Sequence, residues 1–150
     1  MKQGRSLQQK FAAYAETGAQ LKPVFSEVAA RLCDRLLDTK INFSLALDLG
    51  AGLGSVRENL PQKKQPEMFV DADFSPAVMA HNTGQNRLIM DGEAPFPFQA
   101  KTFDLITSNL LLPWVKNVPR LLAQAGRALK EDGLFLASTL GEESFYELRS

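Results

Sequence analysis

Two kinds of hydrophobic spacing divide the chain. Residues 6–15 and 22–37 carry apolar side chains every three to four positions, which predicts an amphipathic helix over each range. Pro23 fits the first turn of the second helix, and we expect Gly18 to form a turn between the two helices. The N-terminal part of the chain is therefore predicted to be helical.

From residue 43 onward, short and nearly continuous apolar runs replace the helical spacing. Such runs are typical of strands that are buried on both faces of a parallel sheet. We predict strands over residues 43–49, 68–72, 87–90, 103–108 and 134–138.

Helical segments fall between these strands, and we predict helices over residues 55–60, 77–82 and 118–130. Ser75 and Asn117 are the expected N-caps, and Asp132 with Gly133 is expected to end the last helix. Strands that alternate with helices indicate right-handed βαβ units. The predicted fold is a doubly wound α/β domain with a mainly parallel sheet.

Composition places the chain among soluble globular proteins. The 150 residues suffice for one domain, and 17 basic residues balance 17 acidic ones, which argues against a nucleic-acid partner. Cys33 is the only cysteine, so a reducing compartment is expected. Residues 1–10 lack the apolar core of a secretion signal, and no run approaches the roughly 20 apolar residues of a membrane span. We therefore expect a cytoplasmic protein.

The strongest signal for ligand binding is DLGAGLG at residues 48–54, which ends the first predicted strand. In an open parallel sheet, ligands bind at this carboxyl end. We interpret the three glycines, Gly50, Gly52 and Gly54, as more than a tight turn requires. Their lack of a side chain would let a ligand lie against the main chain.

The glycine spacing favours one class of ligand. It reads G-x-G-x-G, whereas dinucleotide-binding proteins carry G-x-G-x-x-G, and no phosphate-binding Gly-Lys-Ser/Thr occurs. Asp48 precedes the first glycine by two residues. Its carboxylate would repel a pyrophosphate but suits an ammonium group. We expect S-adenosylmethionine (SAM), which carries an ammonium and a sulfonium, and we disfavour an NAD-dependent dehydrogenase.

Acidic residues also follow the next two predicted strands. We expect Asp73 to accept both ribose hydroxyls, because it leads directly into the helix that Ser75 begins. We place Asp71 on the opposite side of the strand, as a solvated or helix-capping acid. Asp91, followed by Gly92, offers an acceptor for an adenine amino group and a free backbone N–H for a ring nitrogen.

Taken together, residues 50–54, 73–76, 91–93 and 103–106 resemble the successive motifs of the class I SAM-dependent methyltransferases. The resemblance runs from about Phe11 to Arg149. It implies the strand order 3-2-1-4-5 with helices on both faces, a helical segment 1–40 over the cofactor cleft, and a SAM-binding domain over 41–150. The cofactor-binding residues that it implies are Asp48, Gly50, Ala51, Gly52, Gly54, Asp73, Phe74, Asp91, Gly92, Glu93 and Asn109.

Residues 108–115 and 141–149 are similar to two narrower groups. One is the malonyl-acyl-carrier-protein O-methyltransferases of biotin synthesis. The other is the respiratory complex I assembly factors, which use SAM binding in hydroxylating an arginine of a subunit. Pro113 departs from the His or Gln usual in both groups, and the two last strands of the family sheet are expected to be missing from this chain.

The resemblance implies a methyl acceptor that is a small molecule, a carrier protein or another protein, with a carboxylate or an acyl-carrier thioester as candidates. Trp114 and Tyr14 are expected on the acceptor side of the cofactor. No catalytic acid or base is assigned, because the sulfonium already activates the methyl group. His81 lacks companions for a metal site. A SAM-binding assembly factor that transfers no methyl group remains the alternative.

Overall fold

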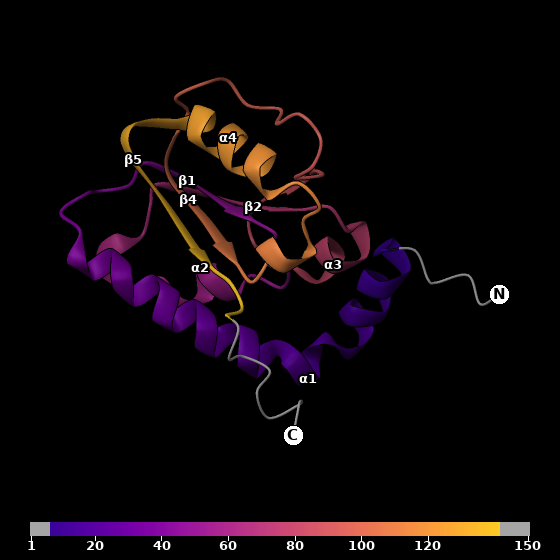
Figure 1. The fold of residues 1–150 in the computed structure, drawn as a ribbon. Coiled ribbons are helices and arrows are strands. Elements are labelled where there is room, and N and C mark those ends of the chain that lie inside the picture. Colours follow the sequence, from indigo (N-terminus) through magenta and orange to yellow (C-terminus); the bar gives the residue numbers. More distant parts are fainter. Residues whose placement is uncertain (1–6, 142–150) are drawn as a thin grey trace.

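The structure, a computed structural model, describes residues 7–141, with side chains from residue 20 onward. In this described part, a parallel sheet has the order β3-β2-β1-β4-β5, as predicted (Figure 1). Its strands are β1 (Leu45–Leu49), β2 (Met68–Asp73), β3 (Asn86–Ile89), β4 (Phe103–Asn109) and β5 (Leu129–Ser138). The chain reverses direction across the sheet between β3 and β4. This reversal places a topological switch point at the carboxyl ends of β1 and β4.

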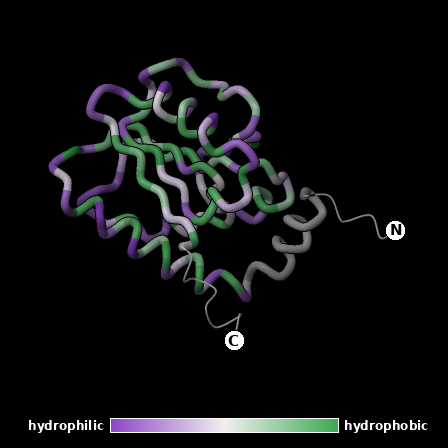
Figure 2. Tube along the Cα trace, viewed as in Figure 1, coloured by the Kyte–Doolittle hydropathy of each residue, from purple (hydrophilic) through white to green (hydrophobic). Residues whose placement is uncertain are grey.

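Two hydrophobic clusters fill the space on the two faces of the sheet. On one face, Ala46 and Leu105 pack with Leu32 and Leu36 from the N-terminal helical region. On the other face, Leu47 of β1 packs among residues of α4 (Val118–Ala128). The alternation of neighbouring β1 residues between the clusters is the strand period of two. Figure 2 shows the consequence, with mostly hydrophobic strands in the middle and hydrophilic segments at the periphery.

The first helix differs from the prediction. Residues 7–34 form one helix, α1 (Leu7–Asp34), and the turn expected at Gly18 is wrong. A glycine inside a helix costs only about 1 kcal/mol, which packing can offset. Pro23 lies inside α1 instead of beginning a second helix, and α1 is visibly bent (Figure 1). The 3₁₀ turn η1 (Arg35–Asp38) follows.

The shorter helices follow their predicted caps. They are α2 (Ser55–Asn59), α3 (Pro76–His81) and α4, with 3₁₀ turns at η2 (Gln62–Lys64) and η3 (Leu112–Trp114). The Ser75 hydroxyl accepts from the Val78 N–H, and the Asn117 side chain accepts from the Arg120 N–H. α4 ends at Ala128, two residues earlier than predicted, because the chain enters β5 at once.

The N-terminal helix packs against the helices that follow β1 and β2. α1 packs on α2 and α3, and its Cys33 is buried against α2, with the thiol 3.6 Å from the Val56 carbonyl oxygen. Burial, with Asp48 nearby, raises the pKa of Cys33 to about 12, so the thiol acts as a core group. Over the described range, none of the helices combines the length and apolarity that a membrane span requires.

Candidate functional site

The glycine segment forms a tight loop between β1 and α2. Gly50, Gly52 and Gly54 have φ values of +69°, +56° and +90°. All three lie in the left-handed region that favours glycine, so the conformation of the turn accounts for part of the glycine pattern. The interpretation that they exceed the needs of a turn stays a prediction. The loop is fastened to β2 by the Ala51 N–H, which donates to the Ala72 carbonyl at 3.0 Å.

One of the three glycines also leaves open space. A Cβ built on Gly50 would lie 2.9 Å from Leu111, and one on Gly54 would meet the Arg57 side chain. A Cβ on Gly52 would meet nothing within 4 Å. Of the three positions, Gly52 alone exposes main chain that a ligand can approach.

Two adjoining cavities open at this loop, with volumes of about 290 and 240 Å³. Leu21 and Phe25 of α1 line the first, which is mainly apolar. Asp91 and Glu93 line the second, which is therefore acidic. The residues common to both walls are Gly50, Asp73, Phe74, Leu111 and Trp114. An elongated ligand with one apolar and one polar end would fit across the shared wall.

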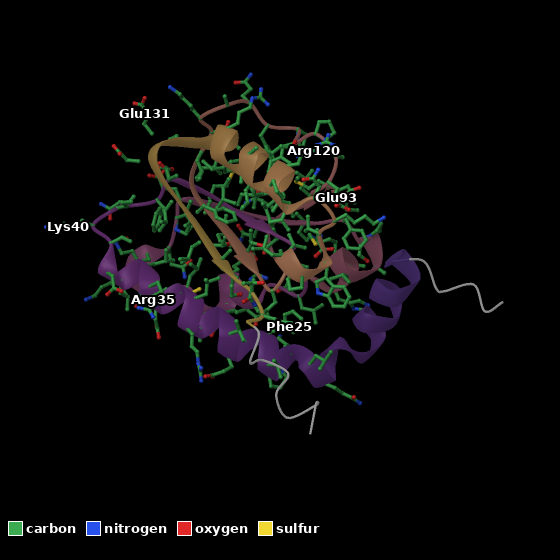
Figure 3. The ribbon with its side chains drawn as sticks, in the orientation of Figure 1. Phe25, Arg35, Lys40, Glu93, Arg120 and Glu131 are labelled. Atoms are coloured by element: carbon green, nitrogen blue, oxygen red, sulfur yellow. The ribbon has the colours of Figure 1, made fainter. Side chains whose placement is uncertain are left out.

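Most of the predicted site residues come together here. The first cavity also takes in Ala51, Gly52 and Asn109, and the second takes in Gly92. Asp48 and Gly54 line neither cavity. Tyr14 lies outside the residues whose side chains are described. In Figure 3, Phe25 and Glu93 mark this end of the sheet, while Lys40 and Glu131 lie toward the opposite end.

Asp73 occupies the junction of the two cavities. One carboxylate oxygen accepts the Gly52 N–H at 3.0 Å and the other accepts the Ser75 N–H at 3.0 Å. Burial raises the pKa of Asp73, and these backbone donors act against the rise. Each oxygen keeps lone-pair capacity beyond its backbone bond. The carboxylate is thus oriented in advance and can accept hydroxyl groups.

The acids after β3 differ in how far the protein already uses them. The Asp91 carboxylate accepts the Glu93 N–H at 2.9 Å and remains exposed. Glu93 accepts the N–H groups of Lys116 and Asn117 at 2.6 and 3.0 Å. Asp91 is therefore better placed for a ligand, while Glu93 fastens its loop to the start of α4.

Asn109 and Trp114 also stand on the cavity wall. The Asn109 amide donates to the Phe25 carbonyl at 3.0 Å and accepts from the Ser138 hydroxyl at 2.7 Å. Asn109 therefore ties α1 to β4 and β5 with the same polar atoms that a ligand would need. Trp114 is 55% exposed in η3 and borders both cavities.

Asp48 lies beneath the loop rather than in the cavity. It is fully buried, its Oδ1 accepts from the Thr107 hydroxyl at 2.8 Å, and its Oδ2 has no partner among the described residues. Burial raises its pKa well above the usual range, and the carboxylates of Asp71 and Asp73 add to the rise. Asp48 lies on the same face of the sheet as Asp73 but is level with Asp71, two residues earlier along β2, so its side chain lies below both cavities. Its contact with a ligand ammonium group stays a prediction.

The sequence predicted that Asp71 is a solvated or helix-capping acid, and the structure shows that it is neither. It shares a face of β2 with Asp73, because residues two apart point the same way, so the predicted opposite placement is wrong. It is fully buried, lies opposite Asp48 in the β1–β2 register, and pairs with Arg57 at 3.0 Å. Burial raises its pKa, and Arg57 opposes the rise. Asp71 lines neither cavity, and its carboxylate is held by Arg57 beneath the loop.

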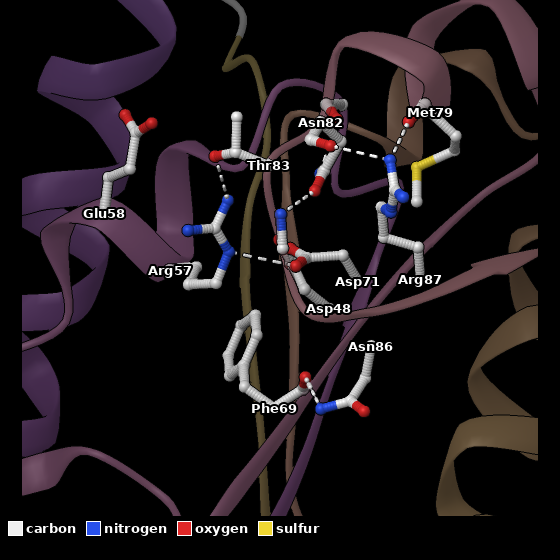
Figure 4. A network of polar contacts seen from close by, with 12 residues as sticks. Asp48, Arg57, Glu58, Phe69, Asp71, Met79, Asn82, Thr83, Asn86 and Arg87 are labelled. Atoms are coloured by element: carbon white, nitrogen blue, oxygen red, sulfur yellow. Dashed lines mark hydrogen bonds and ion pairs between the residues drawn. The ribbon is translucent and has the colours of Figure 1, made fainter.

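The connection from α3 to β3 completes this polar network, which Figure 4 shows from close by. Arg57 also donates to the Thr83 hydroxyl at 3.3 Å. The backbone of Gly84 passes so close to Asp71 that a Cβ there would collide with its carboxylate. The Asn82 amide donates to the Gly52 carbonyl at 2.9 Å. The sequence interpretation missed Arg57 and Asn82; a lone cation one turn beyond the glycines was the signal available for Arg57.

The described residues contain no group of three or more His, Cys, Asp or Glu side chains that would hold a metal ion. His81, the single histidine, is exposed on α3. The carboxylates and backbone amides at the cavities are suited to hydroxyl and amino groups.

Comparison with known proteins gives consistent matches. Residues 47–137 match the methyltransferase domain family. The chain is 38% identical over 127 residues to the human arginine-hydroxylase NDUFAF5, mitochondrial, covering 82% of this chain and 36% of that protein. It is 30% identical over 138 residues to malonyl-[acyl-carrier protein] O-methyltransferase 1 of Coxiella burnetii, covering 92% of this chain and 48% of that protein.

A solved SAM-dependent methyltransferase from Archaeoglobus fulgidus has the same fold. The TM-score is 0.68 at 16% identity, over 83% of this chain and 57% of that one. The chain spans less than half the length of the human and Coxiella relatives.

Proposed function

Because the chain belongs to the methyltransferase domain family, we propose that it binds SAM across the two cavities and serves methyl transfer to an acceptor. One observation carries the proposal. The open main chain of Gly52 lies beside the oriented carboxylate of Asp73, at the junction of an apolar and an acidic cavity. The site also lies at the topological switch point, where ligands bind in folds of this type.

The chemistry of the walls fits the parts of SAM. The Asp73 carboxylate is suited to the two ribose hydroxyls, and Asp91 to the adenine amino group. Phe74, which borders both cavities, offers an apolar surface next to the adenosyl group. The acids of the second cavity give this region a negative potential, which favours a cationic ligand.

When bound, SAM supplies a methyl group that its sulfonium activates, and an acceptor nucleophile takes this group in line while S-adenosylhomocysteine leaves. The residues of this chain position the reactants and exclude water. Leu21, Phe25 and Leu111 form apolar walls around the space in front of Gly52. Their contribution to rate would come from orientation rather than from proton transfer.

The acceptor is proposed to be a carboxylate or an acyl-carrier thioester. The Coxiella relative, a malonyl-[acyl-carrier protein] O-methyltransferase, supports this class. We further propose that segment 1–40 covers the cleft, with Tyr14 and Trp114 on the acceptor side; Leu21 and Phe25 in the cavity wall support that placement. A cytoplasmic location and the lack of a nucleic-acid partner remain predictions from composition.

A calorimetric titration of the protein with SAM, S-adenosylhomocysteine and NADH tests the proposal. We expect both adenosyl compounds to bind and NADH not to bind. Transfer of a labelled methyl group from SAM to malonyl thioesters tests the acceptor. Binding of NADH without binding of either adenosyl compound would overturn the proposed function.

One alternative has a specific observation in its favour. The 38% identity to human arginine-hydroxylase NDUFAF5 supports a SAM-binding protein that transfers no methyl group. Mass spectrometry of arginine-containing peptides separates the two, because hydroxylation adds an oxygen atom and methylation adds a methylene unit. Methyl transfer to a thioester acceptor would exclude the alternative, whereas an added oxygen would favour it.

A further inference from the structure

Side chains hold both peptide groups that flank the Gly52 Cα. The Gly52 N–H donates to Asp73 Oδ2 at 3.0 Å, and this contact orients the peptide before the Cα. The Gly52 carbonyl accepts from Asn82 Nδ2 at 2.9 Å, and this contact orients the peptide after it. Both dihedral angles of Gly52 are thereby restrained. Glycine otherwise has more conformational freedom than any other residue.

Asn82 is itself held in one orientation. It is 2% exposed, and its Oδ1 accepts the Gly84 N–H at 2.7 Å. That acceptor role leaves the NH₂ group to face Gly52. Its backbone carbonyl accepts from the Arg87 guanidinium at 3.0 Å, and its N–H donates to the Met79 carbonyl at 3.3 Å. The backbone and the side chain of Asn82 are therefore both held in place where the amide contacts Gly52.

The two contacts on Gly52 come from residues that flank α3. Asp73 ends β2 three positions before the first residue of this helix, and Ser75 joins them because its N–H donates to Asp73 while its hydroxyl caps the helix. Asn82 directly follows the last residue of α3. The short helix is therefore a spacer that sets the separation of the two side chains.

We propose that Asn82 is a positioning residue of the cofactor site. Its amide keeps the Gly52 carbonyl turned toward α3, so the Cβ-free side of the loop faces the cavity before the ligand arrives. Asn82 lines neither cavity and acts through Gly52. Ordering the loop in advance lowers the entropy that binding would otherwise cost. The inference rests on the proposed function, because it concerns the site for the adenosyl ligand.

Calorimetric affinity for S-adenosylhomocysteine tests this role in the full chain. Asn82→Ala should weaken binding about tenfold, as expected for the loss of one buried hydrogen bond on which the site depends. Asn86→Ala is a matched control, because the Asn86 amide also donates to a backbone carbonyl, that of Phe69 at 3.3 Å, but away from the cavities. We expect the control to bind within about twofold of the unmodified protein.

Asn82→Asp separates positioning from general support of the fold. It keeps an oxygen for the Gly84 N–H but presents a carboxylate to the Gly52 carbonyl, so binding near neutral pH should be weak. Protonation would restore a donor, so the affinity of this variant should recover as the pH falls. The unmodified protein, titrated over the same range, should show no such recovery. The Asn82 side chain also contacts the buried Asp71 carboxylate, so urea denaturation of this variant is measured at each pH. A recovery of affinity that outlasts any change in unfolding free energy assigns the effect to positioning.

The Gly52 amide signal in the proton–nitrogen NMR spectrum of the ligand-free protein gives a second readout. Asn82→Ala should shift this signal and speed its hydrogen exchange, and Asn86→Ala should do neither. If both Asn82 variants bind as tightly as the unmodified protein at every pH, the positioning role is overturned while the proposed function stands. If the unmodified protein does not bind, the proposed function falls and the inference falls with it. Should Asn82→Ala fail to fold, the pH comparison with Asn82→Asp decides.

Discussion

The two ends of the sheet use aspartates in different ways. At the amino end, Asp104 accepts the N–H groups of Ser44 and Leu45 at 3.0 and 2.9 Å, and it pairs with Lys130 at 3.3 Å. Partial burial alone would raise the pKa of Asp104, but these donors outweigh it and the pKa is lowered. This carboxylate is better stabilised in the folded chain than in water.

At the carboxyl end, burial raises the pKa of Asp48, Asp71 and Asp73. Two of these acids keep an oxygen without a partner among the described residues, Oδ2 of Asp48 and Oδ1 of Asp71. The adjacent loop also requires left-handed glycines. The amino end therefore contributes stability, whereas the carboxyl end carries strained and perturbed groups that lower stability, as is common where a cleft binds a ligand. This difference agrees with the proposed site.

The largest effect should come from breaking the ion pair beneath the loop. Arg57→Met leaves the fully buried Asp71 without its cation and should lower the unfolding free energy by about 3 kcal/mol or more. Urea denaturation measures the loss. Arg31→Met is the control, because its pair with Glu27 is exposed on α1 and should contribute less than about 1 kcal/mol. Equal losses of unfolding free energy in the two variants would show that the buried ion pair stabilises the fold no more than the exposed one.

Filling the space at Gly52 should remove ligand binding from the carboxyl end. Gly52→Val places a branched side chain where no atom lies within 4 Å, and we expect the affinity for S-adenosylhomocysteine to fall by roughly 100-fold or more. The left-handed backbone should also cost about 1–2 kcal/mol of stability. Gly126→Val makes the same change in open space on α4 and should leave calorimetric affinity unchanged. Normal affinity of Gly52→Val would contradict the assigned site.

Asp73 and Asp104, which lie at opposite ends of the sheet and each accept a pair of backbone N–H groups, provide the most direct comparison. Asp73→Ala should weaken SAM binding by about 1–3 kcal/mol, because a charged acceptor for the ribose is lost. Asp104→Ala should lower the unfolding free energy by about 1–3 kcal/mol through its lost backbone contacts and leave the affinity unchanged. Calorimetry on both variants measures the affinity for SAM, and urea denaturation measures the unfolding free energy. The comparison fails if Asp104→Ala weakens binding as much as Asp73→Ala does.

Replacing Asp48 should change the unfolding free energy least in acid, but it should clearly change how that free energy depends on pH. The pKa of Asp48 is raised in the folded chain, so protonated Asp48 adds to the unfolding free energy in acid. This contribution is full below the pKa of an unfolded aspartate, near pH 4, and is lost as the pH rises through the pKa of the folded state. Asp48→Asn keeps an acceptor for Thr107 and does not ionise, so it should flatten this loss. We expect stability within about 1 kcal/mol of the unmodified protein in acid and a higher stability in alkali.

Denaturation curves over a pH series measure this slope. Asp104→Ala should behave in the opposite sense, because a lowered pKa stabilises above the unfolded value and is lost as the pH falls. Its deficit should therefore shrink in acid. An Asp48→Asn variant with the same slope as the unmodified protein would show that Asp48 is already ionised beneath the loop.

Local chemistry made much of the fold predictable. The strands, their order and the caps at Ser75 and Asn117 follow from hydrophobic period, cap chemistry and resemblance to a family. The continuity of α1 did not follow, because Gly18 and Pro23 favour a break that the helix does not have.

The site was predictable where a residue's place along its strand decides its exposure to the ligand. Asp73 ends β2 and reaches the cavities. Asp48 points to the same face of the sheet as Asp73, but it is level with Asp71, one period of two further from the strand ends, and is therefore buried beneath the loop. The contacts of Arg57 with Asp71 and of Asn82 with Gly52 join residues 14 and 30 positions apart, and only the folded chain reveals them.

The approach of Gly84 to Asp71 has an evolutionary consequence. Any side chain at position 84 would displace the buried carboxylate and with it the ion pair to Arg57. Substitutions at positions 84 and 71 should therefore be inherited together, with a larger residue at one accompanied by a smaller, uncharged residue at the other. Lineages that replace Asp71 would also lose the need for a cation at position 57, so three sites distant in the chain would vary as one unit.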